Sequence, residues 1–144
     1  MAEGLVVAVT QMPCGPDADA NLDRAEGLVR EAAGAGARLV LLQELFESRY
    51  FCAEQDETHL SLARPFEGNP VIARFAALAA ELGVVLPISF FEREHDTFYN
   101  SLTVADADGR VLGLYRKSHI PNGPGYQEKS YFAPGDTGFR VFDT

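Results

Sequence analysis

The fold class is decided by residues 5–42, which read LVVAVTQMPCGPDADANLDRAEGLVREAAGAGARLVLL. Leu5–Val9 is a short β-branched run without alternation, which is typical of a strand buried on both faces. Asn21 is a suitable N-cap for a helix whose apolar stripe repeats at helical spacing over residues 22–32. Leu39–Leu42 is a second buried strand. Strand, helix and strand in this order predict a right-handed βαβ unit with parallel strands.

The remaining sequence predicts that the sheet becomes mixed. After the irregular stretch Gln43–Gly68, an Asn-Pro pair and a later glycine bracket a second helix over residues 69–83. Further strands are expected at Val84–Phe91, Tyr99–Ala105, Val111–Arg116 and Phe139–Phe142. The turn sequence Asp106–Gly109 joins two of them as an antiparallel hairpin. We expect one α/β domain. The last apolar strand has no partner in the sequence that follows it, and two helices are too few to cover both apolar faces of the sheet. We therefore expect that this domain is incomplete and continues past Thr144.

Composition narrows the function classes. The chain has 144 residues, is 47% hydrophobic and carries a formal net charge of −9. This acidic balance argues against a nucleic-acid partner and weakly favours a cationic small substrate, although it also suits a merely soluble surface. The start of the chain lacks a signal-peptide pattern, and its first apolar run is far shorter than the roughly 20 residues that span a bilayer. We therefore expect no membrane partner. Two cysteines are too few for a disulfide framework, so we expect a cytoplasmic protein.

Three charged residues occupy positions where chemistry is expected. Glu44 follows the strand Leu39–Leu42, at the carboxyl end where catalytic groups of parallel sheets collect, and its apolar neighbours should partly desolvate it. Lys117 directly follows the strand Val111–Arg116, where an ammonium group can stabilise negative charge on a carbonyl oxygen under attack. Glu128 is a second acid that could pair with Lys117 and orient it. Taken singly, each residue also fits an ordinary surface charge.

The usual nucleophiles, metal ligands and nucleotide motifs are not found. Cys14 sits in a Pro-Gly turn, and Cys52 follows two aromatic residues, so both are better explained as packing residues than as thiolate nucleophiles. The three histidines are too scattered for a zinc site. The sequence has no glycine-rich phosphate-binding motif.

In combination, these elements resemble the nitrilase (carbon–nitrogen hydrolase) superfamily. Leu39–Phe46 is similar to its first catalytic element, which carries a glutamate, and Tyr115–Pro121 to its second, which carries a lysine. The longer motif Arg116–Lys129, with residues 131–139, is most similar to the branch that acts on N-carbamoylputrescine. The third element of the family, a cysteine after a further strand, is missing from these 144 residues.

The resemblance implies a fold, a site and a reaction. The fold would be the N-terminal part of a four-layer α-β-β-α sandwich, usually found in homo-oligomers and without metal or organic cofactor. Glu44 would be the general base, Lys117 the stabiliser of the tetrahedral intermediate and Glu128 its supporting acid, while Asn122 and Tyr126 would contact the substrate. The complete enzyme would hydrolyse N-carbamoylputrescine to putrescine, ammonia and carbon dioxide.

Two other functions stay open. One is a different amidase of the same superfamily, with a β-ureidopropionase-like or ω-amidase-like substrate. The other is a non-catalytic short form that associates through its open sheet. In every case we expect residues 1–144 alone to be inactive, because they lack a nucleophile.

Overall fold

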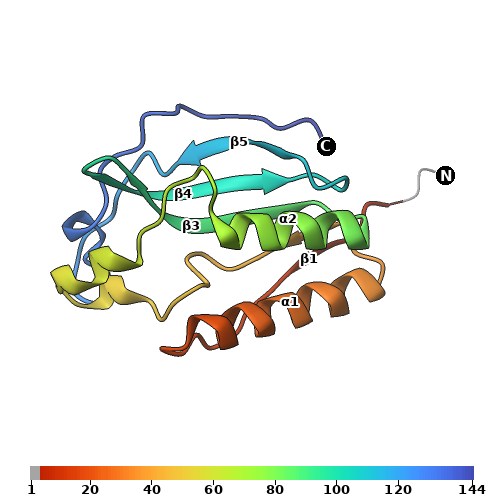
Figure 1. The fold of residues 1–144 in the computed structure, drawn as a ribbon, viewed down its shortest axis with the longest axis horizontal. Helices are drawn as coiled ribbons and strands as arrows, with labels where there is room; N and C mark the ends of the chain where they lie inside the picture. The colour runs from red at the N-terminus through yellow and green to blue at the C-terminus, as the bar shows by residue number, and fades with distance from the viewer. Residues whose placement is uncertain (1–3) are drawn as a thin grey trace.

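A mixed β-sheet carries two helices on one face in the computed structural model, which describes residues 4–144 (Figure 1). The strands are β1 (Val7–Val9), β2 (Leu39–Leu41), β3 (Leu86–Glu94), β4 (Thr97–Ala105) and β5 (Val111–Arg116). The helices are α1 (Ala18–Gly34) and α2 (Pro70–Leu82), with short 3₁₀ turns η1 (Phe51–Ala53), η2 (Glu57–Leu62) and η3 (Glu128–Ser130). This α/β class with a mixed sheet confirms the prediction from the sequence.

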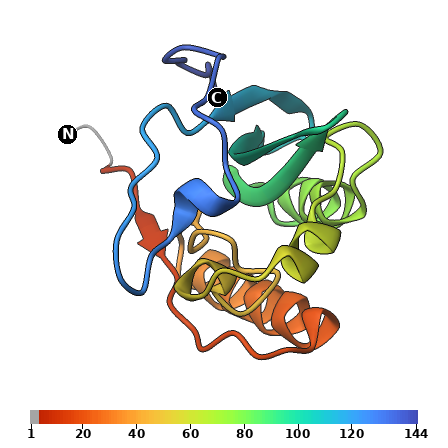
Figure 2. The ribbon, with the colours of Figure 1, turned by 90° about the vertical axis from the view of Figure 1, so that its left-hand side faces the viewer.

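The predicted βαβ unit forms with parallel strands. Residues of β1 pair with those of β2 in the register Val7 to Leu39. A bridge between Leu39 and Val85 then connects β2 to the start of the β3–β4–β5 sheet, whose strands are antiparallel. Seen nearly end-on, α1 and α2 lie together on one side of the strands (Figure 2).

The predicted start of α1 is wrong by one turn. Asp17 is the N-cap, and its carboxylate accepts the Ala20 N–H at 3.1 Å. Asn21 lies inside the helix and is buried, because its side chain has another task. Its amide oxygen accepts the Gly15 N–H at 2.8 Å, and its amide nitrogen donates to the Glu47 carbonyl at 3.1 Å. Asn21 therefore ties together the two loops that follow β1 and β2.

The predicted boundaries of α2 are confirmed. The Asn69 side chain accepts the N–H groups of Val71 at 3.0 Å and Ile72 at 3.3 Å, which satisfies two free donors of the first turn. Gly83 ends the helix in the left-handed region, at φ 64°. The apolar face of α2 packs on the sheet through Phe75, whose ring meets the Phe46 ring edge-on at 5.1 Å.

A second apolar cluster lies beneath the loops that follow the strands. It consists of Leu45, Phe51, Cys52, Ala63, Phe91, Ile120, Tyr131 and Phe132. Within it the Phe51 ring stacks on Phe91 at 4.9 Å and meets Tyr131 edge-on at 5.0 Å. This cluster fixes the long 43–68 connection and the segment around η3 to the same end of the sheet.

The predicted strand Phe139–Phe142 is wrong. The segment 138–144 has no strand structure, and Phe139 and Val141 are 84% and 94% exposed. The segment runs alongside β5, where the Thr137 hydroxyl accepts the Arg116 N–H at 2.9 Å and the Phe142 ring lies close to Gly113. Residues 138–144 make no backbone hydrogen bond with the free edge of β5, so the apolar alternation alone does not make a strand.

The sheet face opposite the helices is apolar and uncovered. Val7 and Val9 on β1 are 58% and 77% exposed, and Leu41 on β2 is 41% exposed. The structure thus contains one helix layer and one sheet layer. None of the helices within residues 4–144 has the length and apolarity needed to cross a bilayer.

Candidate active site

The three charged residues singled out from the sequence meet at one end of the sheet. Glu44 lies just beyond β2, Lys117 is the first residue after β5, and Glu128 begins η3. The Lys117 ammonium donates to Glu44 Oε1 at 3.0 Å and to Glu128 Oε2 at 2.8 Å. Segments 73 and 11 residues away from Lys117 in the chain therefore converge on one cation.

Glu128 is the buried member of this cluster. Its side chain is 5% exposed, because the aromatic cluster around Phe51 and Tyr131 covers it. Both carboxylate oxygens are bonded, since Oε2 accepts from Lys117 and Oε1 accepts from the Tyr50 hydroxyl at 2.9 Å. A buried carboxylate with both oxygens satisfied is held in one orientation.

Lys117 is kept protonated by its two partners. Burial alone would lower the pKa of Lys117, because it disfavours the charged form. Hydrogen bonds to Glu128 and then Glu44 act in the opposite direction and more than compensate, so the pKa lies above its usual value. At neutral pH this residue is a cation and a hydrogen-bond donor, not a base.

Glu44 is less buried than its apolar sequence neighbours suggested. Its side chain is 52% exposed, so the expected desolvation is wrong for residues 4–144. The backbone turns sharply after Glu44, because the next residue, Leu45, has a φ of 53°, which non-glycine residues rarely adopt. The Leu45 N–H donates to the buried Ser89 hydroxyl at 3.0 Å, which holds this turn.

Only one oxygen of Glu44 is used by these contacts. Oε1 accepts from both Lys117 and the Asn100 side-chain amide, at 3.0 and 2.5 Å. Among the described residues, Oε2 has no hydrogen-bond partner. The carboxylate is thus fixed through one oxygen while the other remains available to accept a proton.

Asn100 and Tyr50 belong to the site and were missed from the sequence. Asn100 lies on β4, and its carbonyl accepts the Lys117 N–H at 2.8 Å, so a correct β4–β5 register would have placed it beside Lys117. For Tyr50 no comparable signal exists, because the irregular loop that carries it has no periodicity. Burial, followed by the hydrogen bond to Glu128, raises the pKa of Tyr50 and keeps it a neutral donor.

The structure does not bring Asn122 and Tyr126 to this cluster. The Asn122 side chain accepts the Lys129 N–H at 3.3 Å within its own loop. Tyr126 is 47% exposed and is paired through its backbone with Gly123. Neither side chain lines the pockets that border Lys117 and Tyr50.

Neither cysteine has the properties of a nucleophile, as the sequence indicated. Cys52 is fully buried, and burial, followed by the negative charges of Glu128 and Glu44, raises the pKa of its thiol to about 12. Burial also raises the pKa of Cys14, whose thiol contacts the Phe46 carbonyl at 3.4 Å. The described residues 4–144 therefore bring two carboxylates and a cation together, and neither of their thiols is a reactive thiolate.

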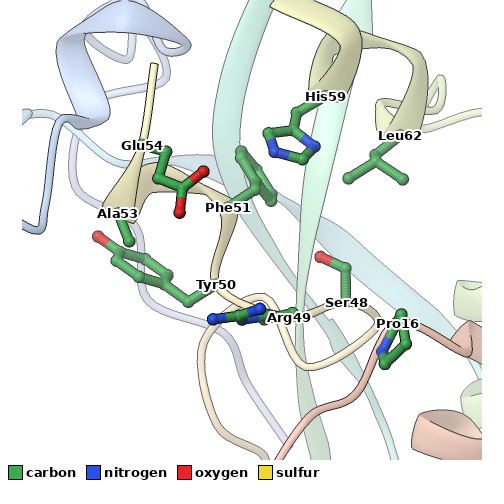
Figure 3. A pocket seen from close by; sticks show the side chains of 9 residues that line it. All are labelled: Pro16, Ser48, Arg49, Tyr50, Phe51, Ala53, Glu54, His59 and Leu62. Carbon is green, nitrogen blue, oxygen red and sulfur yellow. The ribbon is translucent and has the colours of Figure 1, made fainter. Parts of the chain in front are cut away.

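One pocket contains residues of the cluster, and a second contains Tyr50, which bonds Glu128. One, of about 290 Å³, contains Glu44, Asn100 and Lys117 and opens towards the apolar sheet face. The other, of about 340 Å³, lies on the far side of Tyr50 (Figure 3). Arg49, Tyr50, Phe51, Glu54, His59 and Leu62 line it, together with Pro16, Ser48 and Ala53. Tyr50 connects the charged cluster to the second pocket, because its hydroxyl donates to Glu128 and the residue lines that pocket.

Comparison with known proteins agrees with the resemblance read from the sequence. Residues 6–144 match the family model described as carbon-nitrogen hydrolase. N-carbamoylputrescine amidase of Arabidopsis thaliana is 56% identical over 97% of this chain and 47% of its own length. A citrullinase of Francisella tularensis is 44% identical over 96% of this chain and 48% of its own length.

Solved structures give the same result for the fold. A carbon-nitrogen hydrolase from Helicobacter pylori superposes with a TM-score of 0.84 at 38% identity, covering 92% of this chain and 46% of that one. The chain thus spans about half the length of the relatives it matches.

Proposed function

Because this chain belongs to the carbon–nitrogen hydrolase family, we propose that it supplies the acid–base part of an amide-cleaving active site. Glu44 is the general base, Lys117 the oxyanion stabiliser, and Glu128 the residue that holds Lys117 charged and in place. The supporting observation is the Lys117 ammonium, which lies between the two carboxylates at 3.0 and 2.8 Å. The nucleophile would be a cysteine outside residues 1–144, since the two present thiols stay protonated.

The free oxygen of Glu44 suggests the path of the proton. Glu44 Oε2 takes the proton from the incoming thiol, and the sulfur attacks the carbonyl carbon of the substrate. The oxyanion that forms is stabilised by the Lys117 ammonium. Ammonia then leaves with the proton held by Glu44, and water hydrolyses the remaining thioester with Glu44 again as base.

A ureido compound with a cationic tail, N-carbamoylputrescine, is the substrate we propose. The relatives that share 56% identity carry that substrate in their names, and the net charge of −9 favours a cation. Cleavage would give ammonia and a carbamate that decomposes to putrescine and carbon dioxide. The citrullinase at 44% identity also acts, by its name, on a ureido compound.

The test uses the protein translated from the complete reading frame that contains these residues. Ammonia release from N-carbamoylputrescine should exceed release from carbamoyl-β-alanine, citrulline and ω-amides. Lys117→Met and Glu44→Gln should each lower kcat about 10²–10⁴-fold, because each removes a transition-state interaction. Lys129→Met, which changes an exposed lysine on the same segment, should leave kcat unchanged. Faster turnover of carbamoyl-β-alanine would overturn the substrate, and an active Lys117→Met protein would overturn the site.

A second candidate is a non-catalytic form that associates through its sheet, favoured by the exposed Val7, Val9 and Leu41. Under the main proposal the complete protein is a cytoplasmic homo-oligomer, whereas residues 1–144 alone turn over no substrate. Light scattering on both proteins separates the candidates: a stable, cooperatively melting dimer of residues 1–144 would favour the second.

A further inference from the structure

A buried cluster of charges lies directly beside Lys117 and has no part in the proposed chemistry. The Arg116 guanidinium, 7% exposed, donates to both oxygens of Glu92, from Nε at 2.9 Å and from Nη2 at 2.6 Å. Glu92 is 2% exposed and also accepts from the Ser101 hydroxyl. The ring of Tyr99 packs on the guanidinium, 4.0 Å from its centre. The cluster thus joins β3, β4 and β5 around the bidentate Arg116–Glu92 pair, and Arg116 also pairs with the more exposed Glu94 at 2.5 Å and Asp136 at 3.0 Å.

Arg116 and Lys117 project from opposite faces of the sheet. Arg116 pairs with Ser101 on β4, and the next residue, Lys117, bonds the carbonyl of Asn100. Successive side chains of a strand alternate in direction, so the Ser101–Arg116 row faces the ion pair and the Asn100–Lys117 row faces the site. A slip of β5 by one residue would exchange these faces and remove Lys117 from Glu44.

The hairpin turn does not fix this register alone, because a bulge lies between the turn and the site. Ala105 pairs with Val111, but Thr103 already pairs with Leu114, so β5 has one extra residue between these two pairs. Gly113, with φ 152°, lies in that bulge. The register at the end of β5 therefore depends on where this bulge forms as well as on the turn. A contact near Arg116 that permits only one register would fix it.

We propose that the Arg116–Glu92 ion pair is this contact and that Arg116 is a positioning residue for Lys117. A buried ion pair adds little net stability over an apolar pair of similar size, but it requires one specific register. An apolar pair would tolerate a slipped strand, whereas a slipped Arg116 would leave Glu92 buried without its cation. The positioning role rests on the proposed function of Lys117, but its geometric effect can be measured without turnover.

The chain offers an internal reference for that measurement, because Lys117 and Lys129 are its only two lysines. Lys129 is exposed, while Lys117 is held between two carboxylates. Acylation with an amine-reactive ester, followed by mass spectrometry, gives both rates in one sample of the 144-residue chain. The variants are Glu92→Gln, which breaks the ion pair, and the double variant Glu92→Leu/Arg116→Met, which replaces it with apolar groups.

We expect the double variant to unfold cooperatively, with Lys117 acylated about tenfold faster than in the unmodified chain while the Lys129 rate is unchanged. A tenfold rise corresponds to a shift of one pKa unit. Arg110→Met is the matched control, because it removes an exposed arginine that pairs with Asp106 and Asp108 at the turn, and both rates should stay constant. A folded double variant with an unchanged Lys117 rate would overturn the proposal. So would the loss of cooperative unfolding in both Glu92 variants, since the pair would then serve the fold itself.

Discussion

Replacing Lys117 by methionine should destabilise the fold by an amount that the geometry sets. The substitution keeps the aliphatic stem and removes the only cation bonded to Glu128 among the described residues. The carboxylate, 5% exposed, would then keep only the Tyr50 hydroxyl as a partner. Breaking a fully buried ion pair costs about 3–5 kcal/mol. Because Lys117 is itself 28% exposed and the Tyr50 hydroxyl still bonds Glu128, we expect the free energy of unfolding to fall by about 2 kcal/mol.

Urea unfolding followed by circular dichroism measures this loss. A change of about 2 kcal/mol corresponds to a Tm lower by about 6 °C for a chain of this size. Lys129→Met is the control, because it removes the same charge from an exposed position and should change the free energy of unfolding by less than about 0.5 kcal/mol. Adding Glu128→Gln to Lys117→Met should recover at least half of the loss, because no buried charge is left. Equal stability of the Lys117 and Lys129 variants would refute the reasoning.

Three further predictions concern the thiols, the helix caps and the core. Since burial raises the pKa of Cys52 from 9.0 to about 12, iodoacetamide at pH 8 should modify Cys14 first. The contribution of protonated Cys52 to stability is complete below about pH 9 and is lost as the pH rises towards 12, which alkaline unfolding curves would show. Asn69→Ala should cost about 1–2 kcal/mol in urea unfolding, and Asp17→Ala less, because its cap is exposed. Phe46→Ala should cost about 3–5 kcal/mol in the same assay, and a loss under 1 kcal/mol would contradict its core position.

Local patterns predicted the parts of the fold that local forces decide. The β1–α1–β2 unit follows from two apolar runs around one amphipathic segment, and the Asn69 cap and Gly83 stop of α2 follow from their own side chains. The same logic failed at Asn21, whose amide caps no helix because it bonds a loop 26 residues away. It also failed at Phe139, because apolar alternation does not supply the backbone hydrogen bonds of a strand, and residues 138–144 make none with the free edge of β5.

The site shows the same division. Glu44 and Lys117 were found because strand ends are visible in the sequence, and their convergence follows from the order of strands in the sheet. Tyr50 and Asn100 were missed because their partners, at positions 128 and 44, are 78 and 56 residues away. Asn122 and Tyr126 lie away from the Lys117 cluster, and their predicted contact with a substrate stays a prediction, because a loop sequence does not reveal which way its side chains point.

The distance in sequence between Glu44 and Lys117 has a consequence for synthesis on the ribosome. After Glu44 is added, another 73 residues must be translated before its cation exists, which takes roughly 4–15 s at typical elongation rates of about 5–20 residues per second. During this interval β1, α1 and β2 can already pack against one another, while the Glu44 carboxylate has no cation to pair with. The Glu44 carboxylate is therefore made long before its cation, and a nascent chain can complete this group of charges only after Glu128 has also been translated.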